Sequence, residues 1–237
     1  MNPTTVVALV VCLVLVALLL PGLRANLRLF QRLRQSRPLA QGLPPDDGPA
    51  KISGQASGAT LSAPISGRPC VLWQIEVREF RSGPGRGGWK TRYRHTSGEH
   101  LTVSSGALLV HIHITDARLL LSGDLDASQS RFTPLSASMR ARLHQLGLPV
   151  ESQLGFNRQL SVAEQLIAAG TVVFAQGEVE QINGMPHLLG SPTAPLLLSD
   201  QSEQQLLERL RRRVAISAAG ILSLSVSALF LALMLIF

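Results

Sequence analysis

The feature that most constrains this chain is a pair of long apolar segments without any charged residue. One reads "TTVVALVVCLVLVALLL", from Thr4 to Leu20, and the other reads "VAISAAGILSLSVSALFLALMLIF", from Val214 to Phe237. About 20 apolar residues in a helix that rises ~1.5 Å per residue cross a hydrocarbon core of ~30 Å. We therefore predict transmembrane helices over residues 4–23 and 214–237, with the first extended to Leu23 to reach the required length.

A cleaved signal peptide is the alternative for the first segment. Its leading residues, "MNPTT", contain no lysine or arginine, and "PGLR" follows where a small-residue cleavage motif would stand. The second segment has no polar face, which argues against an amphipathic helix in a soluble core. A retained anchor and two membrane spans are the preferred interpretation.

Arginines on the inner side of both segments predict the orientation. They are Arg24, Arg28, Arg32, Arg34 and Arg37 after the first span, and Arg209, Arg211, Arg212 and Arg213 before the second. Because cytoplasmic loops near membrane spans carry an excess of lysine and arginine, we expect the middle of the chain to be cytoplasmic. The expected location is the inner, or plasma, membrane of a cell, crossed twice.

The net charge of +7 does not by itself indicate nucleic-acid binding. Without those nine arginines, 13 of the 22 basic residues remain against 15 acidic ones, so the rest of the chain is nearly neutral. The juxtamembrane arginines instead predict a bilayer with anionic headgroups as a partner. The two cysteines, Cys12 in a span and Cys70 outside it, are not expected to pair and cannot build a cysteine-rich zinc module.

The composition between the spans divides the chain further. Residues 24–50 combine a basic amphipathic arm, "RANLRLFQRLRQSR", with the linker "PLAQGLPPDDGPAK". We expect a folded β-rich domain over residues 51–201 and a connecting helix over 202–213, with Ser202 as a candidate cap. The fold class is therefore α+β: a mainly antiparallel β domain with one or two helices, flanked by two transmembrane helices.

Alternation of apolar and polar residues predicts most of the strands. "CVLWQIEVREF" places Val71, Trp73, Ile75 and Val77 on an apolar face, and "WKTRYRHTS" places Trp89, Thr91, Tyr93 and His95 on one face with Lys90, Arg92 and Arg94 on the other. "HLTVSSGALLVHIHI" predicts two strands, and "GTVVFAQGEVEQI" predicts another that ends at the turn dipeptide Asn183-Gly184. "LSASMRARLHQLGL", residues 135–148, predicts a helix, whereas "SVAEQLIAAG" fits either a helical turn or a strand end.

The glycine-rich stretch "SGPGRGGWKT", residues 82–91, resembles a phosphate-binding loop in its glycine spacing. Such a loop needs a helix after the glycines, because the free N–H groups of the helix bind the phosphate. The residues after these glycines alternate instead, which is typical of a strand. We predict a hairpin tip and no nucleotide or other cofactor.

His111 and His113, two residues apart, are the only candidates for a catalytic or metal site. In a strand both rings lie on one face, and a third metal ligand could come from His95, His100 or Glu99. The simpler interpretation is that Ile112 and Ile114 face the core and both histidines face water or a neighbouring loop. No catalytic, cofactor-binding or metal-binding residue is assigned, and Cys70 is interpreted as a buried apolar residue rather than a nucleophile.

Two groups of residues resemble the GIDE, or "beside a membrane" (BAM), domain family. The first comprises Leu61, Ala63-Pro64, Gly67 and Pro69-Cys70, and the second comprises Glu164, Ile167, Gly170, Val173-Phe174 and Gly177. The resemblance covers about residues 53–210. It implies a β-rich domain held close to a bilayer and a relationship to RING-type E3 ubiquitin ligases of mitochondria.

The chain departs from that family in two ways. Ser104-Ser105-Gly106 stands where the family has a short Asp-x-x-Gly hairpin, and no RING with its zinc ligands follows the second span before Phe237. We therefore expect a non-catalytic scaffold, sensor or binding module that binds another membrane protein, a lipid headgroup or a peptide. A ligase-like protein by family name, or a metal-dependent enzyme that uses His111 and His113, are the alternatives.

Overall fold

The structure is a computed structural model, and it divides the chain into two compact units. It describes residues 3–39, 48–81, 87–98, 100–115, 117–123, 125–130, 132–151, 157–191 and 194–236. The helical unit comprises Met1–Ser36 with Ser202–Phe237, and the β unit comprises Arg37–Gln201.

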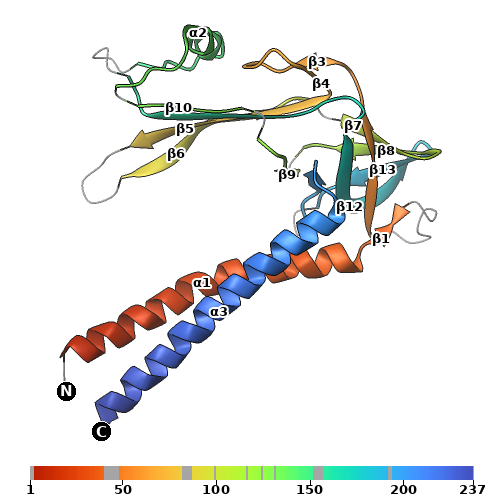
Figure 1. The fold of residues 1–237 in the computed structure, drawn as a ribbon. Coiled ribbons are helices and arrows are strands. Elements are labelled where there is room, and N and C mark those ends of the chain that lie inside the picture. Colours follow the sequence, from red (N-terminus) through yellow and green to blue (C-terminus); the bar gives the residue numbers. More distant parts are fainter. Residues whose placement is uncertain are drawn as a thin grey trace. The chain divides into compact units, whose positions relative to one another are not determined.

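Two long helices form the helical unit. Helix α1 (Pro3–Gln35) covers the first predicted span and continues past Pro21 into the basic arm, and α3 (Glu203–Ile236) covers the connecting helix and the second span without a break. The two helices lie side by side with the N and C termini at the same end (Figure 1). Both are long and apolar enough to cross a membrane.

Local interactions fix the start and the packing of α3. The Ser202 hydroxyl accepts a hydrogen bond from the Gln205 N–H, while the Gln205 side chain accepts one from the Ser202 N–H, so the predicted cap is confirmed as a capping box. Along α3 the less exposed residues recur every three or four positions, as on one face of a helix. A methyl group added to Gly220 on this helix would lie 4.0 Å from Leu19 Cδ1 of α1.

Five strands of the β unit close on themselves as a small barrel. Each pairs with the next in the order β2–β7–β8–β13–β12, and β12 returns to pair with β2. Their bounds are Pro49–Ser57 for β2, His100–Ser105 for β7, Leu108–His113 for β8, Met185–Leu189 for β13 and Val172–Ile182 for β12. Three short strands flank them, namely β1 (Arg37–Pro38), β14 (Leu197–Ser199) and β9 (Arg118–Leu120).

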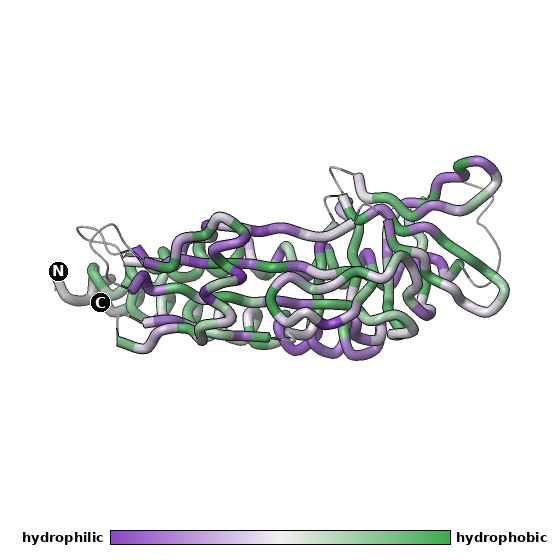
Figure 2. The backbone as a smooth tube through the Cα atoms, turned by 90° about the horizontal axis from the view of Figure 1, so that it is seen from above, coloured by the Kyte–Doolittle hydropathy of each residue, from purple (hydrophilic) through white to green (hydrophobic). Residues whose placement is uncertain are grey.

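The barrel is filled by the inward half of each alternating strand. Val103, Val110, Ile112, Ala175 and Leu188 are fully buried in one apolar cluster. The alternation of hydrophilic and hydrophobic residues along the strands can be followed in Figure 2. The turn dipeptide Asn183-Gly184 joins β12 to β13 with positive φ at both residues, as the sequence predicts.

A four-stranded antiparallel sheet forms the second part of the β unit. Its order is β10 (Leu125–Gln129), β11 (Leu160–Ile167), β5 (Leu72–Arg81) and β6 (Gly88–Thr96). Helix α2 (Ala137–Gln145) covers one face (Figure 1), with Leu143 buried against Ile75, Val77 and Val162. The predicted α+β class and the predicted helix near residues 135–148 are confirmed, and the ambiguous "SVAEQLIAAG" segment is mostly strand β11.

One strand departs from its predicted faces. Tyr93 and His95 do lie opposite Val77 and Ile75, but Thr91 and Trp89 lie opposite Arg78 and Phe80, on the other face. The cause is a β-bulge that leaves Arg92 without a partner on β5 and reverses the alternation beyond it. The prediction that Trp89, Thr91, Tyr93 and His95 share a face was therefore wrong.

The glycine-rich stretch lies between two paired strands. Because β5 and β6 are antiparallel, with Arg81 opposite Gly88, the expected hairpin is confirmed and a strand rather than a helix comes after the glycines. Residues 82–86 of the stretch lie outside the described residues. A phosphate-binding loop would need a helix N-terminus in the place that β6 takes.

Several residues that carry the family resemblance meet around a buried carboxylate. Glu164 on β11 is 0% exposed, and its two oxygens accept hydrogen bonds from the Ile65 N–H at 2.6 Å and the Ser66 N–H at 2.9 Å. Those amides belong to the turn between β3 (Leu61–Ser62) and β4 (Pro69–Cys70). Glu164 therefore holds this hairpin on the four-stranded sheet.

Candidate functional site

The two histidines singled out in the sequence belong to a larger histidine cluster, which comprises His100, His111, His113 and His187. His100 lies opposite His113 on β7 and β8, and His111 lies opposite His187 on β8 and β13. The ring centroids of these pairs are 4.4 Å and 5.0 Å apart. His113 Nε2 and His187 Nδ1 form a hydrogen bond of 2.8 Å.

Tertiary pairing decides which proposed third ligand joins the cluster. His100 does so, while His95 lies on β6 with its ring 5.3 Å from that of Trp73, and Glu99 lies outside the described residues. His187 was missed, because only the parallel pairing of β13 with β8 brings it there. Among the described residues, no group of three His, Cys, Asp or Glu side chains is arranged to hold a metal ion. The metal-dependent alternative remains a prediction.

Crowding in the histidine cluster opposes protonation. Burial first, and then the nearby imidazoles, lower the pKa of His113 and His187, while Glu180 acts in the opposite direction. A second positive charge within about 5 Å of the first is unfavourable in a partly buried site. The cluster therefore favours neutral rings that hydrogen-bond to one another.

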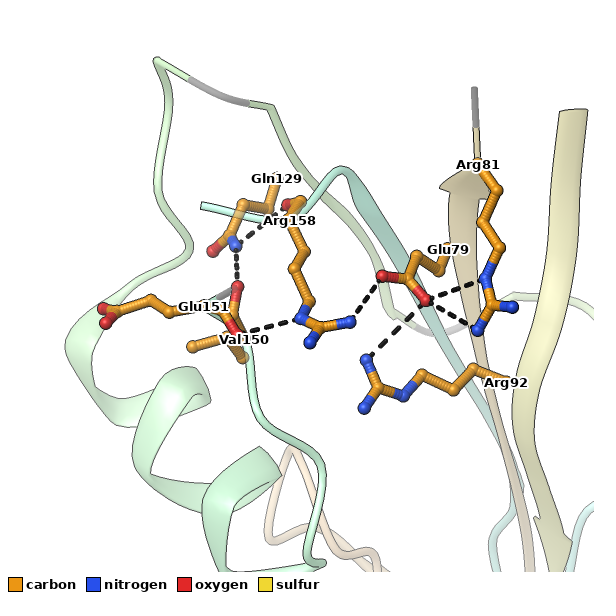
Figure 3. Close-up of polar contacts among 7 residues, drawn as sticks. All are labelled: Glu79, Arg81, Arg92, Gln129, Val150, Glu151 and Arg158. Carbon is orange, nitrogen blue, oxygen red and sulfur yellow. Dashed lines mark hydrogen bonds and ion pairs between the residues drawn. The ribbon is translucent and has the colours of Figure 1, made fainter. Parts of the chain in front are cut away.

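A second polar site lies at the end of the four-stranded sheet, around Glu79. Its carboxylate is only 7% exposed and contacts three arginines (Figure 3). Arg158 donates to Oε1 at 2.8 Å, Arg81 donates twice to Oε2 at 3.3 Å, and Arg92 Nη1 forms an ion pair with Oε2 at 3.8 Å. Burial by itself would raise the pKa of the Glu79 carboxyl, but Arg158, Arg81 and Arg92 hold it below its ordinary value.

Further hydrogen bonds attach this site to the chain that follows α2. Arg158 donates from Nε to the carbonyl of Glu151 at 2.8 Å (Figure 3). Gln129, which is buried, donates to the carbonyls of Val150 and Arg158. The Arg158 guanidinium is thus fixed in place, and the three arginines together carry more charge than the single carboxylate they surround.

The spacing of Glu79 and Glu164 in the sequence predicts that both are buried, although glutamates are usually exposed. Glu79 follows Ile75 and Val77 at a spacing of two, and Glu164 follows Leu160 and Val162 in the same way. In a strand this spacing continues the buried row, so each carboxylate had to find donors inside the protein. From the sequence, Glu164 was identified only through the family resemblance, and Glu79 was missed.

Strand β6 is an accessible edge strand of the β unit. It is the last strand of its sheet, and all nine of its residues are at least partly exposed. Trp89 is 49% exposed and packs edge-to-face on Phe80 with ring centroids 5.6 Å apart. The backbone N–H and C=O groups on the outer edge of such a strand are free to pair with another segment.

A cleft lies beside the C-terminal end of β6, where the two sheets meet. Its volume is about 670 Å³. The side chains that line it are mostly polar and come from β5, β6 and β11 on one wall and from the β8–β9 region on the other, and they include Gln74, Glu76, Arg94, His95, Thr96, Gln165, Thr115 and Arg118. Glu76 and Arg94 form an ion pair of 3.0 Å across this surface. The edge of β6 and the cleft together form the candidate binding surface.

Cys70 is placed as expected. Its side chain is buried, its Sγ lies 3.7 Å from the carbonyl oxygen of Leu61, and burial followed by the charge of Glu164 raises the pKa of the thiol. A thiol that resists ionisation is a poor nucleophile. Cys12 lies in α1, and neither cysteine forms a disulfide.

Comparison with known proteins agrees with the resemblance found in the sequence. A family model named GIDE, with the description E3 ubiquitin ligase, matches residues 110–233, more than half of the chain. This chain belongs to the GIDE family. The matched segment begins in β8 and ends in α3, so Glu164 and Gly177 lie inside it and the β3–β4 hairpin lies before it. No curated protein and no solved structure matches the chain.

Proposed function

We propose that this GIDE-family chain is a membrane-anchored binding or scaffold module that acts without catalysis. The observation that carries the proposal is the exposed edge of β6 beside a polar cleft, because a free strand edge recognises extended segments of other proteins. The two apolar helices of the helical unit would keep that surface close to a bilayer. Its expected partner is another membrane protein.

The same proposal includes an orientation. Arginines follow the apolar part of α1 and precede that of α3, which supports a cytoplasmic position for the β unit and contact of these arginines with anionic headgroups. The membrane would be the inner, or plasma, membrane. Neutral headgroups would weaken this contact, while the spans would stay inserted.

Site-specific photocrosslinking in native membranes tests the binding function. A photoreactive residue at Thr91 on β6, at Thr115 in the cleft or at Leu109 on β8 samples three exposed surfaces of the β unit. We expect a discrete protein adduct from Thr91 or Thr115 and a weaker one from Leu109. If none of the three positions forms a protein adduct, the binding function is wrong.

Ubiquitin transfer is the second candidate, and the description of the family favours it. The purified full chain, incubated with ubiquitin, activating enzyme, a panel of conjugating enzymes and ATP, tests it directly. A non-catalytic module leaves the ubiquitin profile the same as without the chain. Chains of ubiquitin that form only when this protein is present would replace the first candidate by the second.

A further inference from the structure

The charges of β5 and β6 are strongly unbalanced. These two strands contain five cationic side chains, Arg78, Arg81, Lys90, Arg92 and Arg94, and only two carboxylates, Glu76 and Glu79. Strand β6 itself contains no acidic residue. Among the described residues no strand pairs with the outer edge of β6, so this edge presents backbone N–H and C=O groups within an excess of positive charge.

The cations lie on both faces of the sheet. Lys90 lies opposite Glu79, on the face that α2 covers, and Arg94 lies opposite Glu76, on the other face. A flat layer of lipid headgroups would meet only one of these faces. A strand added in the plane of the sheet would place alternate side chains on both of them.

From this arrangement we propose that β6 binds an extended acidic segment of a partner protein as an additional strand. The proposal rests on the binding function proposed above and specifies its ligand. Backbone hydrogen bonds would supply affinity, while carboxylates near Lys90 and Arg94 would supply specificity. Pairing with a second copy of β6 is disfavoured, because cations would then face cations.

Trp89 adds an apolar contact and a means of detection. Its ring is half exposed and shares a face with Arg94, since Trp89 pairs with Phe80 and Arg94 pairs with Glu76. A strand added beside β6 would cover part of this ring with an apolar side chain. The fluorescence of Trp89 would then shift to shorter wavelength in the Trp73→Phe variant, where it is the remaining tryptophan.

The test uses the full chain in nanodiscs of neutral lipid and three synthetic peptides. The first peptide is acidic and extended and repeats two glutamates and two valines, so that both faces of the added strand present carboxylates and valines; the second has lysine in place of glutamate; the third is the acidic peptide with an N-methyl group on every residue, so that neither edge can donate hydrogen bonds. We expect the acidic peptide to bind and shift the Trp89 emission, and the other two to bind at least about tenfold more weakly. Equal binding of the methylated peptide would overturn strand addition.

Matched protein variants locate the binding site. Lys90→Gln with Arg94→Gln should weaken binding of the acidic peptide about tenfold, whereas Arg37→Gln with Arg68→Gln, which removes the same charge elsewhere on the β unit, should not. Equal binding by both double variants would overturn the assignment to β6. Loss of peptide binding in nanodiscs of anionic lipid would also overturn it, because β6 would then be a headgroup contact.

This inference and the proposed function fail separately. A protein adduct at Thr115 or Leu109 in native membranes, with no peptide binding at β6, leaves the binding function in place and rejects the acidic strand. Absence of adducts at all three positions rejects the binding function itself.

Discussion

At the scale of single residues, buried carboxylates decide where the parts of the β unit meet. Glu164 receives two backbone N–H groups of the β3–β4 turn, and Glu79 receives three arginines. Neither contact is available to a glutamine in the same form, since an amide offers one acceptor oxygen and one donor group. The two residues therefore hold neighbouring segments of the β unit together rather than act as reactive groups.

Glu164→Gln tests the contact between β11 and the β3–β4 turn. The substitution leaves either the Ile65 or the Ser66 N–H facing an amide NH₂, so we expect the free energy of unfolding to fall by about 2 kcal/mol. Chemical unfolding of the full chain in detergent measures it. The exposed Glu178, replaced by glutamine, serves as the control and should change stability little. Equal effects of the two substitutions would show that the Glu164 contacts contribute nothing.

The histidine cluster predicts a dependence of stability on pH. Because the pKa values of His113 and His187 are lowered in the folded state, the unfolded chain binds more protons once the pH falls below about 6.5. Folding stability should therefore decrease as the pH falls from 6.5 through the lowered pKa values, and should be constant above that range as far as these residues contribute.

His187→Gln should make this dependence shallower, since it removes one of the two perturbed groups and the 2.8 Å hydrogen bond to His113. Thermal unfolding at stepped pH between about 7.5 and 5, each value about half a unit apart, measures the slope. His144→Gln, at an exposed position on α2, is the control. An unchanged slope in His187→Gln would contradict the histidine cluster as the origin of the pH dependence.

At the scale of elements, β12 is the strand on which the barrel depends. It pairs with β2 along one edge and with β13 and β14 along the other. Gly177 lies in the middle of this strand, and a methyl group there would approach the carbonyl oxygen of Leu189 to 2.5 Å and Leu196 Cδ1 to 2.7 Å. A glycine at this position lets the neighbouring chain approach closely.

Gly177→Ala should therefore reduce stability by about 1–3 kcal/mol, because the Leu189 carbonyl and the side chains of Leu196 and Leu188 must move. Gly123→Ala, where a methyl group meets open space, is the matched control and should have little effect. Chemical unfolding in detergent compares the two variants. A Gly177→Ala variant as stable as the control would mean that the atoms around Gly177 can make room for the methyl group at no cost in stability.

At the scale of the whole molecule, the proposed function assigns the helical unit the role of membrane anchor. Both long helices have the length and composition of membrane spans, and basic residues follow the first and precede the second. Trypsin added to sealed cells that express the chain should leave the β unit intact, and should digest it after the membrane is opened. Cleavage in sealed cells would reverse the proposed orientation and place the binding surface outside.

The local sequence determined the two long apolar helices, the α+β class and most of the strands, because hydropathy and alternation depend only on neighbouring residues. Ser202 and Asn183-Gly184 marked a helix start and a turn for the same reason. These features need no knowledge of distant parts of the chain.

Only the tertiary structure decided how those elements combine. Closure of the barrel through β2 and β12, the bulge at Arg92 and the addition of His187 to the histidine cluster all depend on pairing between distant segments. Likewise, the hydrogen-bond donors to Glu79 and Glu164 come from distant residues, Arg158 and Ile65 among them. Alternation tells which side of a strand is buried, but the strand beside it is chosen by packing of the whole domain, and the candidate binding surface depends on that choice.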